Sequence, residues 1–420
     1  MVREIVTLQI GNEANNVGVH FWNQLDIEQT HNNPLIDYNT YYTFNKKTNV
    51  PSPRALIIDY RNTFGYLLDE IETSLHTNKN DDSSIEIIKR PTESNVWSNK
   101  LKTKAKFHPK SLIPLTDYWY SPVKEENQFD IYPIGQQIYK KMSDQIENSL
   151  HYLLESCDTL QSFRCLYDVN NSFSGLFTSI QDYLHDECPK QPIWSFGVGN
   201  QPSELNLILS LIHSLNENQM PTLTCSNYDD TYKLGLAIQH SLLSTTLTQD
   251  ILVDRLCPMK KNFLNLVSTI PFELKHKTLY HYLENSTDNV FQLTKPIACH
   301  YFLRGIDRNE LYNQSLYKLN VETSADLIEI YLREQYGSKM FVSSDSWIEK
   351  YNHMSLITGL INDDNYSFDY FNNLLNKMKK MNYKLLSKRW HENDFDEQMF
   401  EQMMNDLNSI HEQYQLNTSE

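Results

Sequence analysis

The chain is poor in glycine, with 11 glycines among 420 residues, against a usual share of about 7%. It contains neither a G-x-x-x-x-G-K-[ST] phosphate loop nor a G-x-G-x-x-G turn. H-E-x-x-H zinc helices and G-x-S-x-G nucleophile turns are missing too. These absences exclude the phosphate-binding, zinc-dependent and serine-nucleophile enzymes that carry those motifs.

Positive charge is also scarce, because 37 basic residues face 53 acidic ones and the net charge is −16. A general nucleic-acid binder carries the opposite excess, so no direct nucleic-acid role is expected. No apolar run reaches the ~18 residues of a membrane-spanning helix. The six cysteines form no C-x-x-C pair, which favours a reducing compartment and unpaired, buried thiols.

The first ten residues indicate a strand, because Val6, Leu8 and Ile10 alternate with polar residues and Glu4 is acidic. A basic amphipathic import sequence has neither feature. We therefore expect no cleavable presequence, and the absence of a long apolar run predicts no transmembrane segment.

Strand and helix patterns alternate along the first half of the chain. The opening strand is followed by a polar turn at residues 11–16 and then by a helix. Short apolar runs at 54–60, 163–169 and 193–198 are typical of strands buried on both faces, with helical patterns between them. This order predicts an α/β fold around a parallel sheet.

The last sixty residues predict two further helices. The first spans about 368–390, with Phe371, Leu374 and Leu385 facing inward and lysines facing outward. The second, acidic helix begins after Asp394, and the two are expected to pair as an antiparallel hairpin that offsets its own charge. Residues 391–420 hold eight carboxylates and no Lys or Arg. That acidic face is either simply solvated or a docking surface.

The turn at residues 11–16 leads into a helix N-terminus, where backbone N–H groups can receive an anion. An ordinary βα connection with asparagines capping the helix has the same pattern. The turn alone leaves both interpretations open.

Residues 3–23 resemble the start of a tubulin and, within that superfamily, the Misato (Dml) family. Other segments agree with this family in the same order along nearly the whole chain. They are residues 96–98, 108–111, 157–163, 168–175, 186–189, 270–272, 303–308 and 390–414.

The resemblance implies a tubulin-like α/β fold in three parts. Residues 1–226 would form the parallel-sheet nucleotide-binding-type domain, interrupted by a polar loop at about 76–106. Residues 227–365 would supply a core helix and an intermediate α/β domain. Residues 366–420 would form the C-terminal helical hairpin with its acidic tail.

The same resemblance marks the positions of a vestigial nucleotide pocket. They are Gly11, Asn12, Asn15, Asn16, Asp59, Ser174, Gly175 and Asn227. Departures from the tubulin pattern surround them: Glu13 replaces an uncharged residue, Arg61 replaces an acidic one, and bulky Asn170, Asn171 and Phe173 stand in the glycine-rich loop. Residues 257–262, matched to the hydrolysis segment, contain no carboxylate. We expect no GTPase activity, no metal and no required cofactor, with bound GTP or GDP as the alternative.

The functional expectation comes from the resemblance alone. It implies a non-catalytic protein in mitochondrial distribution, morphology and mitochondrial DNA inheritance, found in the cytoplasm and at mitochondria. Partners would be mitochondrial outer-surface proteins, tubulin or chaperonin, and the chain would be a monomer or a low-order oligomer. The alternatives are a tubulin- or chaperonin-associated factor in spindle and microtubule organisation, and an active polymerising GTPase.

Overall fold

The computed structural model describes most of the N-terminal half of the chain and the C-terminal lobe. The described residues are 3–30, 36–44, 50–64, 67, 101, 106–115, 117–121, 128–200, 203–216, 221–226, 231–241, 248–258, 261–269, 297–304, 340–345 and 356–415. Residue 227, residues 270–272 and most of the expected loop at 76–106 lie outside them.

A ten-stranded sheet runs through the protein in the order β11-β10-β12-β9-β8-β7-β6-β1-β4-β5. The strands from β5 to β9 are parallel, whereas β12 runs antiparallel to both β9 and β10. Their bounds are β1 Glu4–Ile10, β4 Ala55–Tyr60, β5 Leu112–Leu115, β6 Leu160–Asp168, β7 Ile193–Gly199, β8 Thr222–Ser226, β9 Phe263–Thr269, β10 Ala298–Arg304, β11 Met340–Asp345 and β12 Leu356–Asn362. The predicted parallel α/β sheet and its opening strands are confirmed. The predicted boundary at residue 226 falls between β8 and the next helix, α7.

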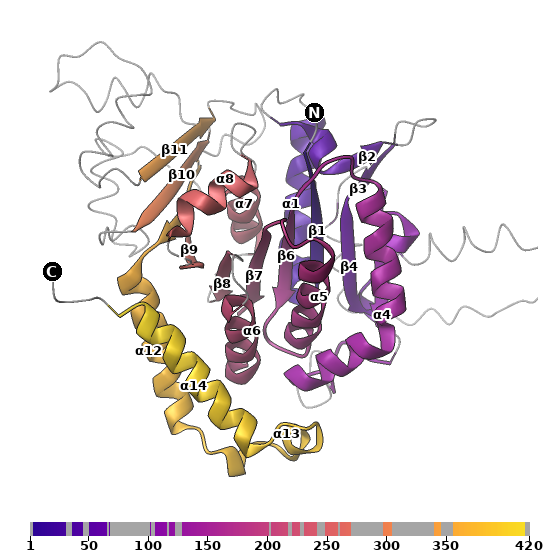
Figure 1. Ribbon diagram of the computed structural model, residues 1–420. Coiled ribbons are helices and arrows are strands. Elements are labelled where there is room, and N and C mark those ends of the chain that lie inside the picture. Colours follow the sequence, from indigo (N-terminus) through magenta and orange to yellow (C-terminus); the bar gives the residue numbers. More distant parts are fainter. Residues whose placement is uncertain are drawn as a thin grey trace, which may run out of the picture.

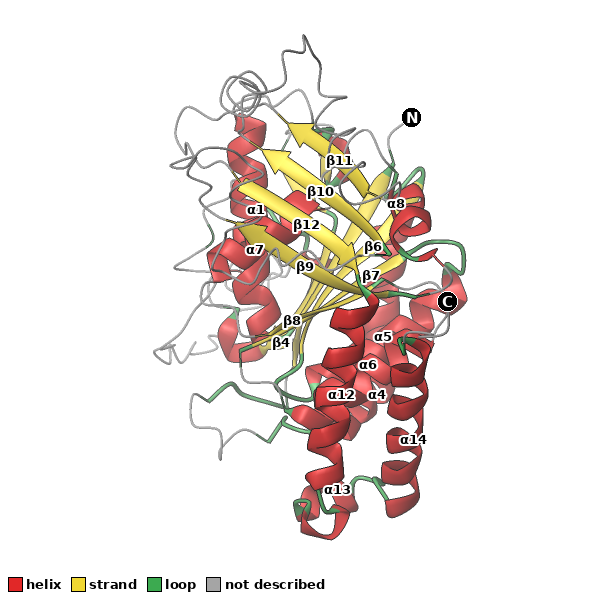
Figure 2. Cartoon of the chain, turned by 90° about the vertical axis from the view of Figure 1, so that its left-hand side faces the viewer, coloured by secondary structure: helices red, strands yellow, loops and turns green. Residues whose placement is uncertain are grey.

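Two helical layers cover the sheet, as Figures 1 and 2 show. One layer holds α4 (Tyr132–Glu155), α5 (Phe173–Glu187) and α6 (Glu204–Asn216), which pack side by side. The other holds α1 (Asn12–Thr30) and α7 (Thr231–Ser241), with α8 (Gln249–Leu256) beside them. A small hairpin of β2 (Tyr42–Phe44) and β3 (Pro51–Pro53) lies next to α1. Burial of alternate apolar strand residues against both layers forms the core.

The C-terminal lobe packs on the first layer through α12 (Asp364–Lys380), α13 (Lys388–Glu392) and α14 (Glu397–Gln413). The predicted apolar seam is confirmed, because the facing side chains of α12 and α14 are buried. They are Phe371, Leu374, Leu375 and Met378 on α12, and Phe400, Met403, Leu407 and Ile410 on α14.

Two predictions about this lobe are wrong. The first helix stops at Lys380, because Met381 is extended and Asn382 caps a short 3-10 turn, η7 (Tyr383–Leu385). Leu385 therefore faces solvent and is 82% exposed. The lysine side chains do not neutralise α14 either: Lys377 pairs with Glu204 of α6 at 2.9 Å, and no ion pair joins α12 to α14 among the residues described.

The described cysteines and helices agree with the absence of disulfides and of membrane-spanning helices. All six cysteines are free thiols; Cys165, Cys225 and Cys299 are buried and the other three are partly exposed. None of the helices described here combines the length and the apolar character that crossing a bilayer requires.

Candidate functional site at the carboxyl edge of the sheet

Gly11 forms the turn between β1 and α1 at the carboxyl edge of the sheet. Its φ is +101°, a conformation that glycine adopts without the strain of a side chain. A Cβ at this position would lie 2.6 Å from Cβ of Asp168 and 2.7 Å from the Phe173 ring. The backbone N–H of Gly11 donates to Ile58 O at 2.9 Å, and Gly11 O accepts from Asn15 N to open α1. The turn is therefore tightly enclosed by β6 and the start of α5.

Two buried carboxylates end the neighbouring strands. Asp59, at the end of β4, accepts from Asn15 Nδ2 at 2.8 Å and from Tyr60 N at 2.8 Å. Asp168, at the end of β6, accepts from Asn170 N at 2.8 Å and Asn171 Nδ2 at 3.0 Å. The parallel sheet brings both to one edge, because the carboxyl ends of parallel strands coincide.

Glu13 makes this edge more acidic still. Its backbone N lies 3.4 Å from Asp168 Oδ2, and its negative charge acts on both aspartates. Burial, followed by smaller effects that include Glu13, raises the pKa of Asp59 to about 7 and that of Asp168 to about 8. The Tyr120 pKa is also raised, first by burial and then by the charges of Glu13, Asp168 and Asp59. The edge therefore disfavours additional negative charge.

Aromatic side chains fill the space next to Gly11, on the side of the Phe173 ring. The fully buried Phe173 ring packs edge-on against Phe129 and Tyr60, with ring centroids 4.8 and 5.0 Å apart. Tyr120 continues the cluster at 6.0 Å from Tyr60. Phe173, at the start of α5, therefore fills the space beside the Gly11 turn. In the β6–α5 connection, the Asn171 side chain donates to Asp168 and accepts from Phe173 N.

Among the candidate pocket residues, Gly11, Asn12, Asn15 and Asp59 come together at this edge. Oδ1 of Asn12 and Oδ1 of Asn15 are buried acceptors with no hydrogen-bond donor in the described structure. Asn16 follows on α1 and is half-buried. The βα turn at residues 11–16 is thus linked to the Asp59 carboxylate through Asn15. Asn227 lies outside the described residues.

Ser174 and Gly175 have local roles in the packing of α5. Ser174 Oγ donates to Asn171 O at 2.9 Å. A Cβ on Gly175 would lie 2.0 Å from Tyr132 O, and one on Gly135 would lie 1.9 Å from Ser172 O. These two glycines therefore let α4 and α5 approach backbone to backbone.

Residues 257–262 join α8 to β9, and Lys261, one of those that the structure describes, is anchored by a hydrogen bond and an ion pair. Asn362 Nδ2 donates to Leu256 O and to Lys261 O, both at 2.7 Å, and Lys261 pairs with Asp364 at 2.6 Å. A carboxylate does stand earlier, in the first turn of α8, where Asp250 lies 3.8 Å from Arg3. Because Arg3 precedes β1, Asp250 lies at the end of the sheet opposite to Gly11.

Sequence reasoning missed Asp168 as a member of the site, although it saw the strand that precedes it. The available signal was a carboxylate directly after a buried parallel strand. Tyr120 gave no signal, because only the tertiary structure brings it to Tyr60 and the three acidic side chains. In the described part of the chain, no three His, Cys, Asp or Glu side chains are arranged to hold a metal ion.

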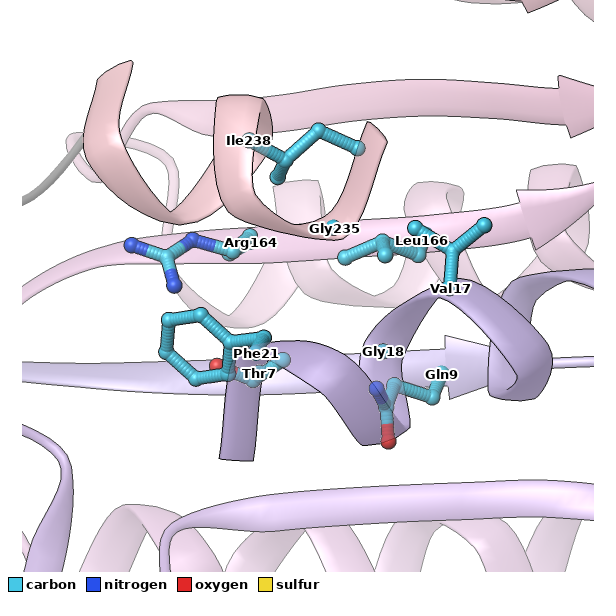
Figure 3. Close-up of a pocket in the computed structure, with 9 residues that line it drawn as sticks. All are labelled: Thr7, Gln9, Val17, Gly18, Phe21, Arg164, Leu166, Gly235 and Ile238. Atoms are coloured by element: carbon cyan, nitrogen blue, oxygen red, sulfur yellow. The ribbon is translucent and has the colours of Figure 1, made fainter. Parts of the chain in front are cut away.

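A second recess lies on the other helical layer, between β1, β6, α1 and α7 (Figure 3). It encloses about 210 Å³ of non-atom space, but no part is wide enough for a water molecule. Arg164 lines it and is 1% exposed, and within the described part of the chain none of its three side-chain nitrogens meets an acceptor in good hydrogen-bond geometry, although Tyr41 is close enough to act on its pKa. Its guanidinium instead packs against the rings of Phe21 and Tyr41, at 4.6 and 5.4 Å from their centroids. We assign this recess to packing.

Comparisons with known proteins agree with this architecture. Residues 3–112 match the family model of the Misato Segment II tubulin-like domain, and residues 90–236 match that of the tubulin domain. Together the two matches run across the turn at Gly11, both aspartates and the β6–α5 connection.

Three relatives illustrate the similarity. Protein DML1 of Gibberella zeae is 24% identical over 285 residues, which are 59% of this chain and 56% of that protein. Protein misato homolog 1 of Mus musculus is 25% identical over 256 residues, 48% of this chain and 45% of that protein. The Danio rerio homolog is 28% identical over 124 residues, 29% of this chain and 20% of its own length. The chain thus spans about half the length of the first two relatives. With the tubulin-like sheet and both family matches in place, the chain is similar to the Misato (Dml) family of tubulin-like proteins.

Proposed function

We propose that this chain is a non-catalytic tubulin-fold protein that acts through its surfaces in mitochondrial distribution, morphology and mitochondrial DNA inheritance. In this proposal it hydrolyses no GTP and works in the cytoplasm and at mitochondria, as a monomer or a low-order oligomer. Its partners would be mitochondrial outer-surface proteins, tubulin or chaperonin. Similarity to the Misato (Dml) family supports the cellular part, and the geometry of the carboxyl edge supports the non-catalytic part.

The observation that carries the non-catalytic part is the position of Phe173. Its ring lies 2.7 Å from where a Cβ on Gly11 would stand, in the connection that a phosphate-binding loop would use. A phosphate needs close backbone N–H groups around it, and a buried aromatic ring offers none. The residues present therefore do not fit a nucleoside triphosphate.

The charge at this edge supports the same conclusion. Glu13, Asp59 and Asp168 converge there, and burial, with a further contribution from the charge of Glu13, raises the pKa of both aspartates, so this edge already holds negative charge at a cost. The carboxylate in the first turn of α8, Asp250, lies at the far end of the sheet. Within one chain it does not reach this edge.

Mass spectrometry of small molecules released from freshly purified, denatured protein tests the non-catalytic part. We expect no stoichiometric GTP or GDP, and no GTP hydrolysis above that of Asp59→Asn. Nucleotide at one equivalent, or a turnover that disappears in Asp59→Asn, would contradict the proposal.

Complementation tests the cellular part. Cells depleted of the protein should show altered mitochondrial distribution and loss of mitochondrial DNA, and both wild type and Asp59→Asn should restore them equally. Unchanged mitochondria after depletion, together with spindle defects, would instead favour the microtubule-related alternative.

A further inference from the structure

The bend between α12 and α13 projects from the lower tip of the C-terminal lobe in both views (Figures 1 and 2). Its inner side is anchored: Tyr383 Oη donates to Phe395 O at 3.2 Å and lies 2.9 Å from His391 Nδ1. Asn382 Oδ1 accepts from Lys384 N at 3.0 Å and fixes the turn. The residues that follow Tyr383, namely Lys384 and Leu385, are therefore held outward by a defined backbone.

Leu385 is the most exposed large apolar residue in the described part of the chain, at 82%, compared with 51% for Trp119 and 49% for Met399. One exposed leucine is ordinary by itself. This leucine differs because it stands at the apex of an anchored turn with lysines around it.

Charge is sharply segregated at this bend. Residues 377–391 contain six basic residues and no carboxylate, in a chain whose net charge is −16. Lys377, Lys388 and Arg389 have acidic partners. Lys379, Lys380 and Lys384 are exposed and form no ion pair with the residues described here. The bend therefore presents unneutralised cations around an apolar apex.

We propose that this bend is a docking site for the surface of a bilayer containing anionic phospholipid. A protruding leucine inserts among the headgroups and acyl chains, whereas long lysine side chains keep their ammonium groups at the level of the phosphates. Attraction between clustered lysines and anionic lipid adds to this insertion. The inference goes beyond the proposed function and does not depend on whether the carboxyl edge of the sheet binds a nucleotide.

The shape of the tip favours a flat surface over a peptide ligand. The bend projects beyond the rest of the lobe in both views, so it reaches a planar membrane without obstruction from the sheet (Figures 1 and 2). Acidic Asp394, Asp396 and Glu397 follow on the other side of α13 and are repelled by anionic headgroups. Contact is therefore limited to the bend, which makes binding shallow and salt-sensitive.

Vesicle co-sedimentation of the full chain tests this proposal. We expect binding to vesicles of phosphatidylcholine with phosphatidylserine, no binding to phosphatidylcholine alone, and release by added salt. Lys384→Gln should weaken the binding about 5-fold, as expected for one lysine near an anionic surface. Leu385→Ser should weaken it further, including at salt concentrations where the charge effect is screened.

Matched controls come from other surfaces of the chain. Lys140→Gln changes an exposed lysine of α4, and Ile251→Ser changes an apolar residue of α8 that is 40% exposed. Both should bind as wild type does. Equal binding by all five proteins, equal binding to both vesicle types, or no sedimentation of wild type would overturn the proposal. Capture by immobilised polyglutamate without vesicle binding would also overturn it, in favour of an acidic protein partner.

Discussion

The two faces of the central sheet are built from alternate residues of the same three strands, yet they differ in kind. Toward α4 and α5, β1, β4 and β6 present only apolar and aromatic side chains, with one cysteine. They are Val6, Leu8, Ile10, Leu56, Ile58, Tyr60, Phe163, Cys165 and Tyr167. Toward α1 and α7 the same strands bury polar side chains between the apolar Ile5, Ala55, Ile57 and Leu166. The polar ones are Thr7, Gln9, Asp59, Arg164 and Asp168.

The apolar and the polar side chains of the sheet constrain the fold to different degrees. Burial of apolar groups is non-directional and tolerates any well-packed arrangement. Buried polar groups are costly unless their partners are in place, so each of them fixes a local geometry. The apolar face should therefore supply most of the stability, while the polar face determines the electrostatics of the candidate site.

A large effect is expected on the apolar face. Leu407→Ala should lower the free energy of unfolding by about 2 to 5 kcal/mol, because Leu407 is fully buried in the cluster that joins α14 to the α4–α6 layer. Glu401→Gln, on the exposed face of the same helix, should change it by less than about 0.5 kcal/mol. Urea denaturation measures both. Equal losses would show that charge, rather than packing, holds the lobe.

Glycines at close contacts should also differ between the two faces in what their replacement by alanine costs in stability. Gly175→Ala places a methyl group 2.0 Å from the backbone oxygen of Tyr132, so α4 and α5 must separate, at a cost of about 3 kcal/mol. Gly18→Ala, on the polar face, meets Nε2 of Gln9 at 1.3 Å. A side-chain amide moves more easily than backbone, so we expect about 1 kcal/mol there. The reverse order in thermal denaturation would remove this distinction between the faces.

Glu13→Gln should stabilise the protein in a pH-dependent way. The raised pKa values of about 7 for Asp59 and about 8 for Asp168 mean that the folded chain holds protons that the unfolded chain has released. Wild-type stability should therefore fall as the pH rises from about 4 to 8. Removing the Glu13 charge lowers both pKa values and should recover about 1 kcal/mol at pH 8 and nothing below pH 4. A gain that is independent of pH would refute this origin.

Arg164→Met should have the smallest effect. Replacing a buried guanidinium that has no carboxylate partner among the described residues with an apolar side chain should leave stability unchanged or raise it by about 1 kcal/mol. The contrast is Arg54, which is also buried but lies 4.0 Å from Glu4 and donates to Ser156 Oγ at 2.7 Å.

Arg54→Met leaves buried Glu4 without its cation and should cost about 3 to 5 kcal/mol. Chemical denaturation of the two variants side by side gives the comparison. A comparable loss from Arg164→Met would mean that the polar face holds a partner for this guanidinium.

Much of the architecture was predictable because local pattern and burial coincide. The alternation of Val6, Leu8 and Ile10 and the apolar run ending at Asp59 marked strands that the structure confirms. The end of α12 was not predictable, because apolar spacing continues past Lys380 to Leu385, whereas the extended backbone of Met381 breaks the helix. Apolar periodicity predicts which side chains a helix buries if it forms. It does not predict where the helix ends.

The candidate site divides in the same way. The sequence by itself determined that glycine is missing from the β6–α5 connection, that Glu13 is acidic and that Asp59 ends a buried strand. The folded arrangement was needed to place the Phe173 ring against Gly11, Asp168 and Asp59 at one edge, Arg164 against the rings of Phe21 and Tyr41, and Arg54 beside Glu4. The physical reason is that residue type and spacing are local properties. Contact, desolvation and charge coupling depend on which distant segments the fold brings together.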